Sequence, residues 1–175
     1  MNAQRRDRTY LDLIDDRTGG PRSDVTPIFA DATAFADLID DLATLVAPVA
    51  YDLVISIDAL GFILGGALAI RVGKGFVPIR KGGKLPVAVD SIDVIDYTRQ
   101  TKTLELRRGA IVPGMRVLLV DEWIETGAQV RGAIDLIERQ GGVIVGIAAI
   151  NIDRNQATQH IRTHYVCFAL MHDAE

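Results

Sequence analysis

The stretch with the clearest capacity for chemistry reads VLLVDEWIETGAQV, residues 117–130. Two adjacent carboxylates, Asp121 and Glu122, directly follow an aliphatic run, and the pair Thr126-Gly127 comes shortly after them. Charged groups at the end of a buried strand are costly, so the acidic pair needs a compensating role. Carboxylates accept hydrogen bonds from neighbouring hydroxyl groups, which makes a sugar diol a suitable ligand.

The turn after the two acids suits an anion. If a helix begins near Thr126, the N–H groups of Gly127, Ala128 and Gln129 have no partner inside that helix. Together with the Thr126 hydroxyl they can surround a phosphate, and the helix dipole adds to the attraction. The stretch therefore indicates a phosphorylated ribose, held by its phosphate at the turn and by its diol at the two acids. The plain alternative is that the acids cap a loop and Thr-Gly only makes a turn.

Continuous apolar runs alternate with segments of helical periodicity along the chain. The expected strands are residues 53–57, 76–79, 116–120, 143–150 and 165–170, and the expected helices are residues 31–46, 61–71 and 126–140. The alternating residues 87–95 predict an exposed strand or hairpin arm, and the polar first twenty-odd residues a short helix and an arm. Asp31 or Thr33 is the expected N-cap of the first of these helices. This order predicts an α/β fold with a mainly parallel central sheet flanked by helices. Ligands of such sheets bind beyond the carboxyl ends of the strands, which singles out residues 58–61, 80–84 and 121–129.

Composition restricts the class of function. Net charge is −4, from 19 basic and 23 acidic residues, so a nucleic-acid-binding surface is not expected. The single cysteine, Cys167, cannot form an intrachain disulfide, which favours a cytoplasmic location. The longest apolar stretch, residues 53–70, contains Asp58 and several glycines and divides into a strand and a helix, so no membrane span is expected. No secretory signal is visible at the N-terminus.

The chain resembles the type I phosphoribosyltransferase family in its adenine branch. Besides residues 117–130, the resemblance rests on DVTPIFADATAF at residues 24–35 and on DLVISIDALGFILGGALAIRVGKGFVPIRKGGKLP at residues 52–86. It covers roughly residues 22–150 and is most specific in FVPIRKGGKLP. The resemblance implies one domain over residues 1–175. Residues 1–30 would form an N-terminal arm and part of a small hood, and residues 87–105 a flexible loop or hairpin.

The resemblance also implies a reaction and a set of site residues. In this family a purine nitrogen displaces pyrophosphate from 5-phosphoribosyl-1-pyrophosphate, giving a nucleotide. The implied catalytic residues are Glu122 and Glu125. The phosphate and ribose would be held by Asp121, Glu122, Glu125, Thr126, Gly127, Ala128 and Gln129. The pyrophosphate would be held by Asp58, Ala59, Leu60, Arg80, Lys81 and Lys84. The base would be held by Arg22, Ser23, Asp24, Val25 and Trp123. Mg²⁺ is expected through the pyrophosphate and ribose, without direct protein ligands, and a homodimer is expected.

Several positions depart from the adenine pattern. Leu60 and Ser23 stand where arginines are usual, and Arg22 lies one position before the second of these. Ala128 and Gln129 replace Gly-Thr, and Ala128 fits only if its backbone is right-handed. Glu125 replaces alanine, at a position where hypoxanthine-guanine enzymes carry an aspartate near the base. Glu125 is therefore predicted to act as a general base or to accept a hydrogen bond from the purine, the alternative being that it repels phosphate.

The leading interpretation is an enzyme of purine salvage. A second is a regulatory protein that binds a nucleotide or phosphoribosyl pyrophosphate with weakened chemistry. A third is a transferase for xanthine, another 6-oxopurine or a modified base. The three histidines have no metal-ligand context, and Cys167 is expected in a buried strand. Trp123 could pack over the ligand or in the core, and residues 96–100 match the family's mobile loop only loosely.

Overall fold

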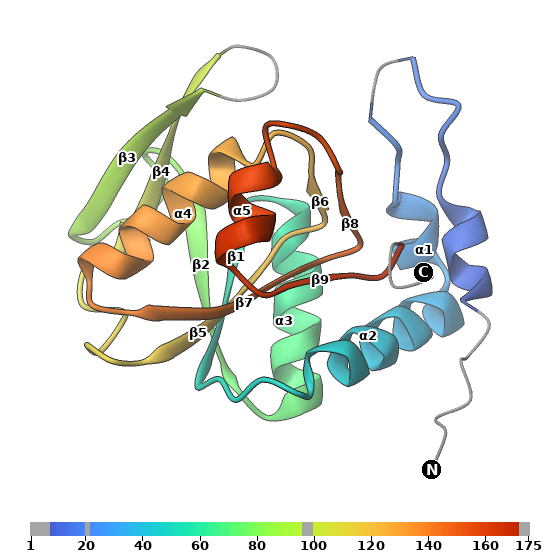
Figure 1. The fold of residues 1–175 in the computed structure, drawn as a ribbon, viewed down its shortest axis with the longest axis horizontal. Helices are drawn as coiled ribbons and strands as arrows, with labels where there is room; N and C mark the ends of the chain where they lie inside the picture. Colours follow the sequence, from blue (N-terminus) through green and yellow to red (C-terminus); the bar gives the residue numbers. More distant parts are fainter. Residues whose placement is uncertain (1–7, 20–21, 96–99, 172–175) are drawn as a thin grey trace.

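The computed structural model describes residues 8–19, 22–95 and 100–171, and its centre is a seven-stranded sheet (Figure 1). The strand order is β3-β4-β2-β1-β5-β7-β9. The parallel strands are β1 (Leu53–Ile57), β2 (Gly75–Lys81), β5 (Arg116–Val120), β7 (Val143–Ala149) and β9 (Cys167–Ala169). The predicted mainly parallel sheet is therefore confirmed. β1 and β5 form its middle because their aliphatic side chains are buried on both faces.

Helices cover both faces of the sheet (Figure 1). α2 (Ala32–Val46) and α3 (Leu60–Val72) pack on one face, and α4 (Ala128–Arg139) and α5 (Gln159–His164) on the other. Successive side chains of β1 alternate between these two cores: Val54 joins the α2–α3 cluster and Ile55 the α4 cluster. Asp31 is the N-cap of α2, because its carboxylate accepts from the N–H groups of Thr33 and Ala34, both at 2.9 Å.

A hairpin extends the sheet on one side. β3 (Val89–Ile95) and β4 (Thr101–Arg107) pair antiparallel, and β4 joins the end of β2 through Arg80 and Lys81. α4 approaches this hairpin closely, since a Cβ at Gly132 would lie 2.5 Å from Val94 Cγ1. A hairpin was one of the two predictions for residues 87–105. Residues 96–99 of the predicted mobile loop lie outside the described residues.

Several short elements were not anticipated from the sequence. They are α1 (Thr26–Ala30), α5 and the two-stranded ladder of β6 (Trp123–Ile124) and β8 (Asn151–Ile152); a 3-10 turn, Thr9–Leu13, stands where a short N-terminal helix was expected. Elements of two to six residues are too short to show a hydrophobic period. Within the described ranges, no helix is long and apolar enough to cross a bilayer.

Candidate functional site

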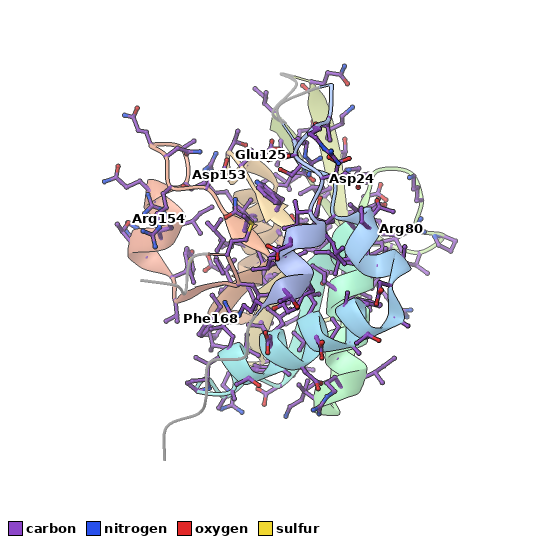
Figure 2. All side chains as sticks on the ribbon, turned by 90° about the vertical axis from the view of Figure 1, so that its right-hand side faces the viewer. Asp24, Arg80, Glu125, Asp153, Arg154 and Phe168 are labelled. Carbon is purple, nitrogen blue, oxygen red and sulfur yellow. The ribbon has the colours of Figure 1, made fainter. Side chains whose placement is uncertain are left out.

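Three neighbouring cavities lie where β1, β2 and β5 end, at the loops singled out by the sequence. One of about 30 Å³ lies at the turn before α4, one of about 170 Å³ lies between the acidic pair and β1–β2, and one of about 250 Å³ faces residues 18–25. Arg22 and Trp123 line all three. In Figure 2, Asp24 and Glu125 lie toward this end of the molecule, whereas Phe168 lies farther down. The cavities thus form a row along one edge of the sheet.

Asp121 and Glu122 stand at the centre of this row. Each is only 8 % exposed. The Glu122 N–H donates to Asp121 Oδ1 at 3.0 Å. Burial, and then the neighbouring Glu122 charge, raise the pKa of the Asp121 carboxyl well above its usual range. α3 can come this close because it carries Gly61, where a Cβ would lie 2.8 Å from Asp121 Oδ1.

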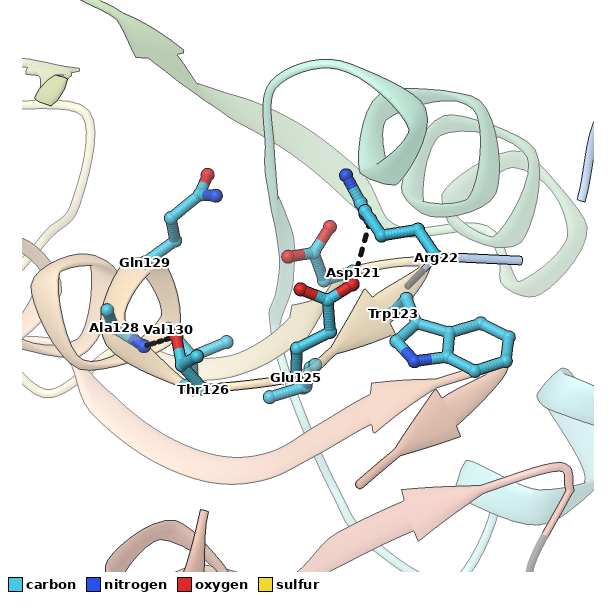
Figure 3. A pocket seen from close by; sticks show the side chains of 10 residues that line it. Arg22, Asp121, Trp123, Glu125, Thr126, Ala128, Gln129 and Val130 are labelled. Atoms are coloured by element: carbon cyan, nitrogen blue, oxygen red, sulfur yellow. Dashed lines mark hydrogen bonds and ion pairs between the residues drawn. The ribbon is translucent and has the colours of Figure 1, made fainter. Parts of the chain in front are cut away.

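Arg22 connects the N-terminal segment to the acidic residues (Figure 3). Its Nη2 lies 2.8 Å from Glu122 Oε1, and its Nε lies 3.0 Å from Glu125 Oε1. Burial is the main cause that raises the pKa of Glu125, the charges of Asp153 and Glu122 add to it, and Arg22 opposes it. One cation is therefore shared by two carboxylates that lie on either side of Trp123.

The turn before α4 has the geometry of an anion site. Gly127 adopts φ 66°, a left-handed conformation that favours glycine, and α4 begins at Ala128. Ala128 is thus in right-handed backbone, so its replacement of glycine is free of strain. Its N–H donates to Thr126 Oγ1 at 3.4 Å. Arg131 supports the turn, because its Nη1 donates to the carbonyl oxygens of Thr126 and Ala157, both at 3.0 Å.

The basic loop after β2 is only partly directed at the cavities. Lys81 lines the 170 Å³ cavity together with Asp58, Ala59 and Leu60. Lys84 Nζ lies 3.9 Å from Asp58 Oδ2, so it also faces this side. The Arg80 guanidinium instead donates to the Lys84 carbonyl at 3.3 Å. The peptide bond between Asp58 and Ala59 is cis.

The predicted base-side residues line the 250 Å³ cavity. They are Arg22, Ser23, Asp24, Val25 and Trp123, joined by Thr18, Leu60 and Glu122. The Asp24 carboxylate accepts from the Thr26 N–H at 2.9 Å, and hydrogen bonds from Thr26 lower its pKa. One oxygen of the Asp24 carboxylate is therefore already hydrogen-bonded to the first residue of α1.

Sequence reasoning missed Asp153, which directly follows β8 and lies four residues beyond the carboxyl end of β7. Trp123 Nε1 donates to its Oδ1 at 3.1 Å. The rule that singled out the loops after β1, β2 and β5 applies equally to the residues after β7, so the signal was present.

Among the described residues, no group of three or more His, Cys, Asp or Glu side chains could hold a metal ion. The carboxylates that line the 170 Å³ cavity are Asp58, Asp121 and Glu122. This donor set fits a Mg²⁺ that arrives with its substrate better than a resident ion. His160 and His164 lie on the exposed face of α5 with their ring centroids 4.0 Å apart, and His172 lies outside the described residues. Cys167 is in β9 as expected, but only half-buried, and burial raises its pKa to about 11.

The phosphoribosyl transferase domain family matches residues 29–173. This chain belongs to the phosphoribosyltransferase family. Adenine phosphoribosyltransferase of Thermobifida fusca is 41% identical over 145 residues, which cover 82% of each chain. The enzyme of Dinoroseobacter shibae is 44% identical over 144 residues, covering 81% of this chain and 79% of its own.

Solved structures agree. Adenine phosphoribosyltransferase of Thermoanaerobacter pseudethanolicus superposes with a TM-score of 0.82 at 31% identity, covering 91% of this chain and 95% of that one. The Giardia lamblia enzyme, complexed with 9-deazaadenine, gives 0.80 at 27% identity, covering 92% of this chain and 94% of its own. The predicted type I fold and adenine branch are confirmed. The chain is a purine-type phosphoribosyltransferase of that branch.

Proposed function

We propose that this phosphoribosyltransferase transfers the phosphoribosyl group from 5-phosphoribosyl-1-pyrophosphate to adenine in the cytoplasm, giving AMP and pyrophosphate. The observation that carries the proposal is the row of three cavities. The turn before α4, the buried acidic pair and the half-open cavity lined by Ser23 and Val25 would hold the phosphate, the ribose and the base respectively. The named relatives are adenine phosphoribosyltransferases, which supports adenine as the base.

The 5′-phosphate would lie at Thr126–Gln129, against the N–H groups at the start of α4. The ribose hydroxyls would face Asp121 and Glu122. The pyrophosphate would lie toward Lys81 and Lys84, whose fixed positive charges favour the negative charge that the leaving group gains. Mg²⁺ bound to the substrate would supply further charge neutralisation there.

The chemical step is a displacement at the anomeric carbon. The base nitrogen forms a bond to this carbon as the bond to the pyrophosphate oxygen breaks, and that oxygen keeps the electron pair. Positive charge builds on the ribose ring, which the two carboxylates stabilise. Glu125 would accept the proton that the base loses, because a carboxyl group with a raised pKa is a stronger acceptor.

We expect Arg22 to exchange one of its ion-pair partners when the substrates bind. Arg22 lies against Glu122 and Glu125, where ribose and base would enter. The substrate hydroxyls would replace the Arg22 contact with Glu122, which leaves Arg22 available to the base pocket. Arg22 would thereby take the base-side place left by Ser23, and residues 8–19 and 22–30 would act as the described part of the hood.

A base screen tests this function. Purified protein is incubated with phosphoribosyl pyrophosphate, Mg²⁺ and each of adenine, hypoxanthine, guanine and xanthine, and nucleotides are measured by mass spectrometry. We expect AMP as the main product, and a rate reduced by about 100-fold in Glu125→Gln if Glu125 is the base.

Other outcomes of the screen have defined meanings. A 6-oxopurine nucleotide as the main product would show that the substrate is that 6-oxopurine and not adenine. Phosphoribosyl pyrophosphate bound in calorimetry without product from any base would favour the regulatory alternative. That alternative draws on Leu60, an apolar side chain in the wall of the 170 Å³ cavity.

We also propose a homodimer. Ile63 and Ile70 lie seven residues apart on α3, so they share one face of the helix, and they are 40% and 86% exposed. Apolar side chains on one helix face are typical of a subunit interface. Sedimentation velocity of the purified protein tests this, and a monomer at micromolar concentration would contradict it.

A further inference from the structure

Trp123 is the single tryptophan of the chain, and it lines the phosphate, ribose and base cavities alike. It directly follows Glu122 and is the first residue of β6, which pairs with β8. A side chain that borders three cavities affects each of them if it rotates. The orientation of the indole ring is therefore a property of the site as a whole.

Asp153 holds that orientation. The indole N–H of Trp123 donates to Asp153 Oδ1 at 3.1 Å, and Asn151 Nδ2 donates to the same oxygen at 2.7 Å. One edge of the indole ring is thus attached to a fixed acceptor. Rotation of the ring about its Cβ–Cγ bond would break this hydrogen bond.

Asp153 is itself fixed through the backbone. The Asp153 N–H donates to the Ile124 carbonyl at 2.9 Å, and the Asp153 carbonyl accepts from the Thr158 hydroxyl. The β6–β8 ladder pairs Trp123 with Asn151 and Ile124 with Ile152. Asn151 is only 4% exposed. The acceptor, its second donor and the ring are therefore parts of one small hydrogen-bonded unit.

We propose that Asp153 is a positioning residue that orients Trp123 as the wall between the base and ribose cavities and thereby sets the affinity for the base. The proposal rests on the proposed function, because the base cavity is assigned there. Asp153 does not line any of the three cavities, so its contact with the base cavity runs through Trp123; its charge separately raises the pKa of Glu125, an effect that Asp153→Asn removes while keeping the acceptor. Loss of the acceptor frees the ring and enlarges or blocks the base cavity. The phosphate turn, held separately by Arg131, stays in place.

The test combines kinetics with tryptophan fluorescence, which reports on Trp123 alone. In Asp153→Ala we expect lower fluorescence anisotropy and a KM for the base raised about tenfold. The KM for phosphoribosyl pyrophosphate should rise less, because Arg131 holds the phosphate turn independently of the indole ring. Asp153→Asn keeps an acceptor oxygen and is expected to restore both anisotropy and base KM to near wild type. Asp37→Ala, an exposed carboxylate on α2, is the matched control and is expected to change neither.

A double-mutant cycle adds a second measurement. Trp123→Phe keeps an aromatic wall but has no N–H to donate, so it should raise the base KM about as much as Asp153→Ala. The double variant should show no further increase, because both changes remove the same interaction. If the increases in base KM of the two single variants multiply in the double variant, the proposal is overturned. Unchanged anisotropy and base KM in Asp153→Ala would also overturn it.

The proposed function and the proposed role of Asp153 can be contradicted by different results. If the wild-type protein turns over no base, the proposed function falls, and the anisotropy of the Asp153 variants still tests the orientation of Trp123. If Asp153→Ala does not fold, as judged by circular dichroism, Asp153→Asn and Trp123→Phe carry the test. Trp123→Phe with an unchanged base KM would then contradict the proposal.

Discussion

Asp121 is a residue at which burial and charge oppose each other, since its carboxyl group is 8 % exposed and lies beside Glu122. Its pKa is raised in the folded protein by burial and by the Glu122 charge. Between the unfolded and the folded pKa the native state binds more protons than the unfolded state. Stability therefore falls as pH rises through this window. In the proposed function the ribose hydroxyls bind this carboxylate and thereby offset the cost.

Asp121→Asn should accordingly stabilise the protein and weaken its function. The amide oxygen still accepts from the Glu122 N–H, and the buried charge is gone. We expect Tm at pH 7 to rise by roughly 2–4 °C for each kcal/mol of relief. The gain should shrink as pH falls toward the usual range of an aspartic acid. The KM for phosphoribosyl pyrophosphate should rise about tenfold, because the neutral amide attracts ribose hydroxyls less strongly.

Calorimetry at several pH values and steady-state kinetics measure both effects. Asp37→Asn on α2 is the matched control, since it makes the same chemical change at an exposed carboxylate away from the cavities. A lower Tm for Asp121→Asn at pH 7 would show that the charge is already compensated in the free protein.

At the scale of elements, the turn into α4 is the proposed site of the 5′-phosphate. Gly127 supplies the left-handed residue at which the chain turns into the helix. α4 itself was predicted from its hydrophobic period, and its buried residues follow that period: Val130, Ala133, Ile134 and Ile137. Its N-terminal end lies in the site because β5 leads into the loop before it.

Gly127→Ala should damage both stability and binding. A Cβ there would lie 2.3 Å from Ile161 Cδ1, and the left-handed backbone adds about 1 kcal/mol of strain. We expect Tm to fall by several degrees and affinity for phosphoribosyl pyrophosphate to fall at least about tenfold. Gly66→Ala in α3 is the matched control, because a Cβ at Gly66 meets nothing within 4 Å. It should stabilise by about 0.5–1 kcal/mol, as expected for alanine in a helix. Equal effects of the two changes would refute the role of the turn.

At the scale of the whole molecule, the charge distribution matters more than the total. The net charge is −4, yet Lys81 and Lys84 lie on the side of the cavities that the leaving group would occupy. A local positive field in an acidic protein attracts an anionic substrate and loses strength with added salt.

Lys81→Gln should raise the KM for phosphoribosyl pyrophosphate about five- to tenfold at low salt, because one cation is removed from the substrate's path. The salt dependence of that KM should also become weaker. Lys74→Gln is the matched control, since Lys74 is exposed before β2, at the opposite end of that strand. Steady-state kinetics between low and moderate ionic strength make the measurement. Identical salt slopes in wild type and Lys81→Gln would contradict a steering role.

The sequence by itself determined the identity of the long elements, the parallel sheet and the three loops at its edge. These follow from local periods and from a general rule about strand ends. β4 was not recognised as a strand of its own, although Leu104 and Leu106 are both 0% exposed in it, because its neighbours in the sheet are set by pairing with β3. Strand pairing depends on segments that local patterns do not connect.

Only the tertiary structure decided which distant side chains meet in the site. Arg22 contacts Glu122 across 100 positions of sequence, and Trp123 contacts Asp153 across 30. Neither contact has a local signal, because each depends on how the N-terminal segment and the end of β7 pack beside β5. The residues capable of chemistry can therefore be read in sequence. Their partners, and with them the charge state and orientation of each group, are set by packing.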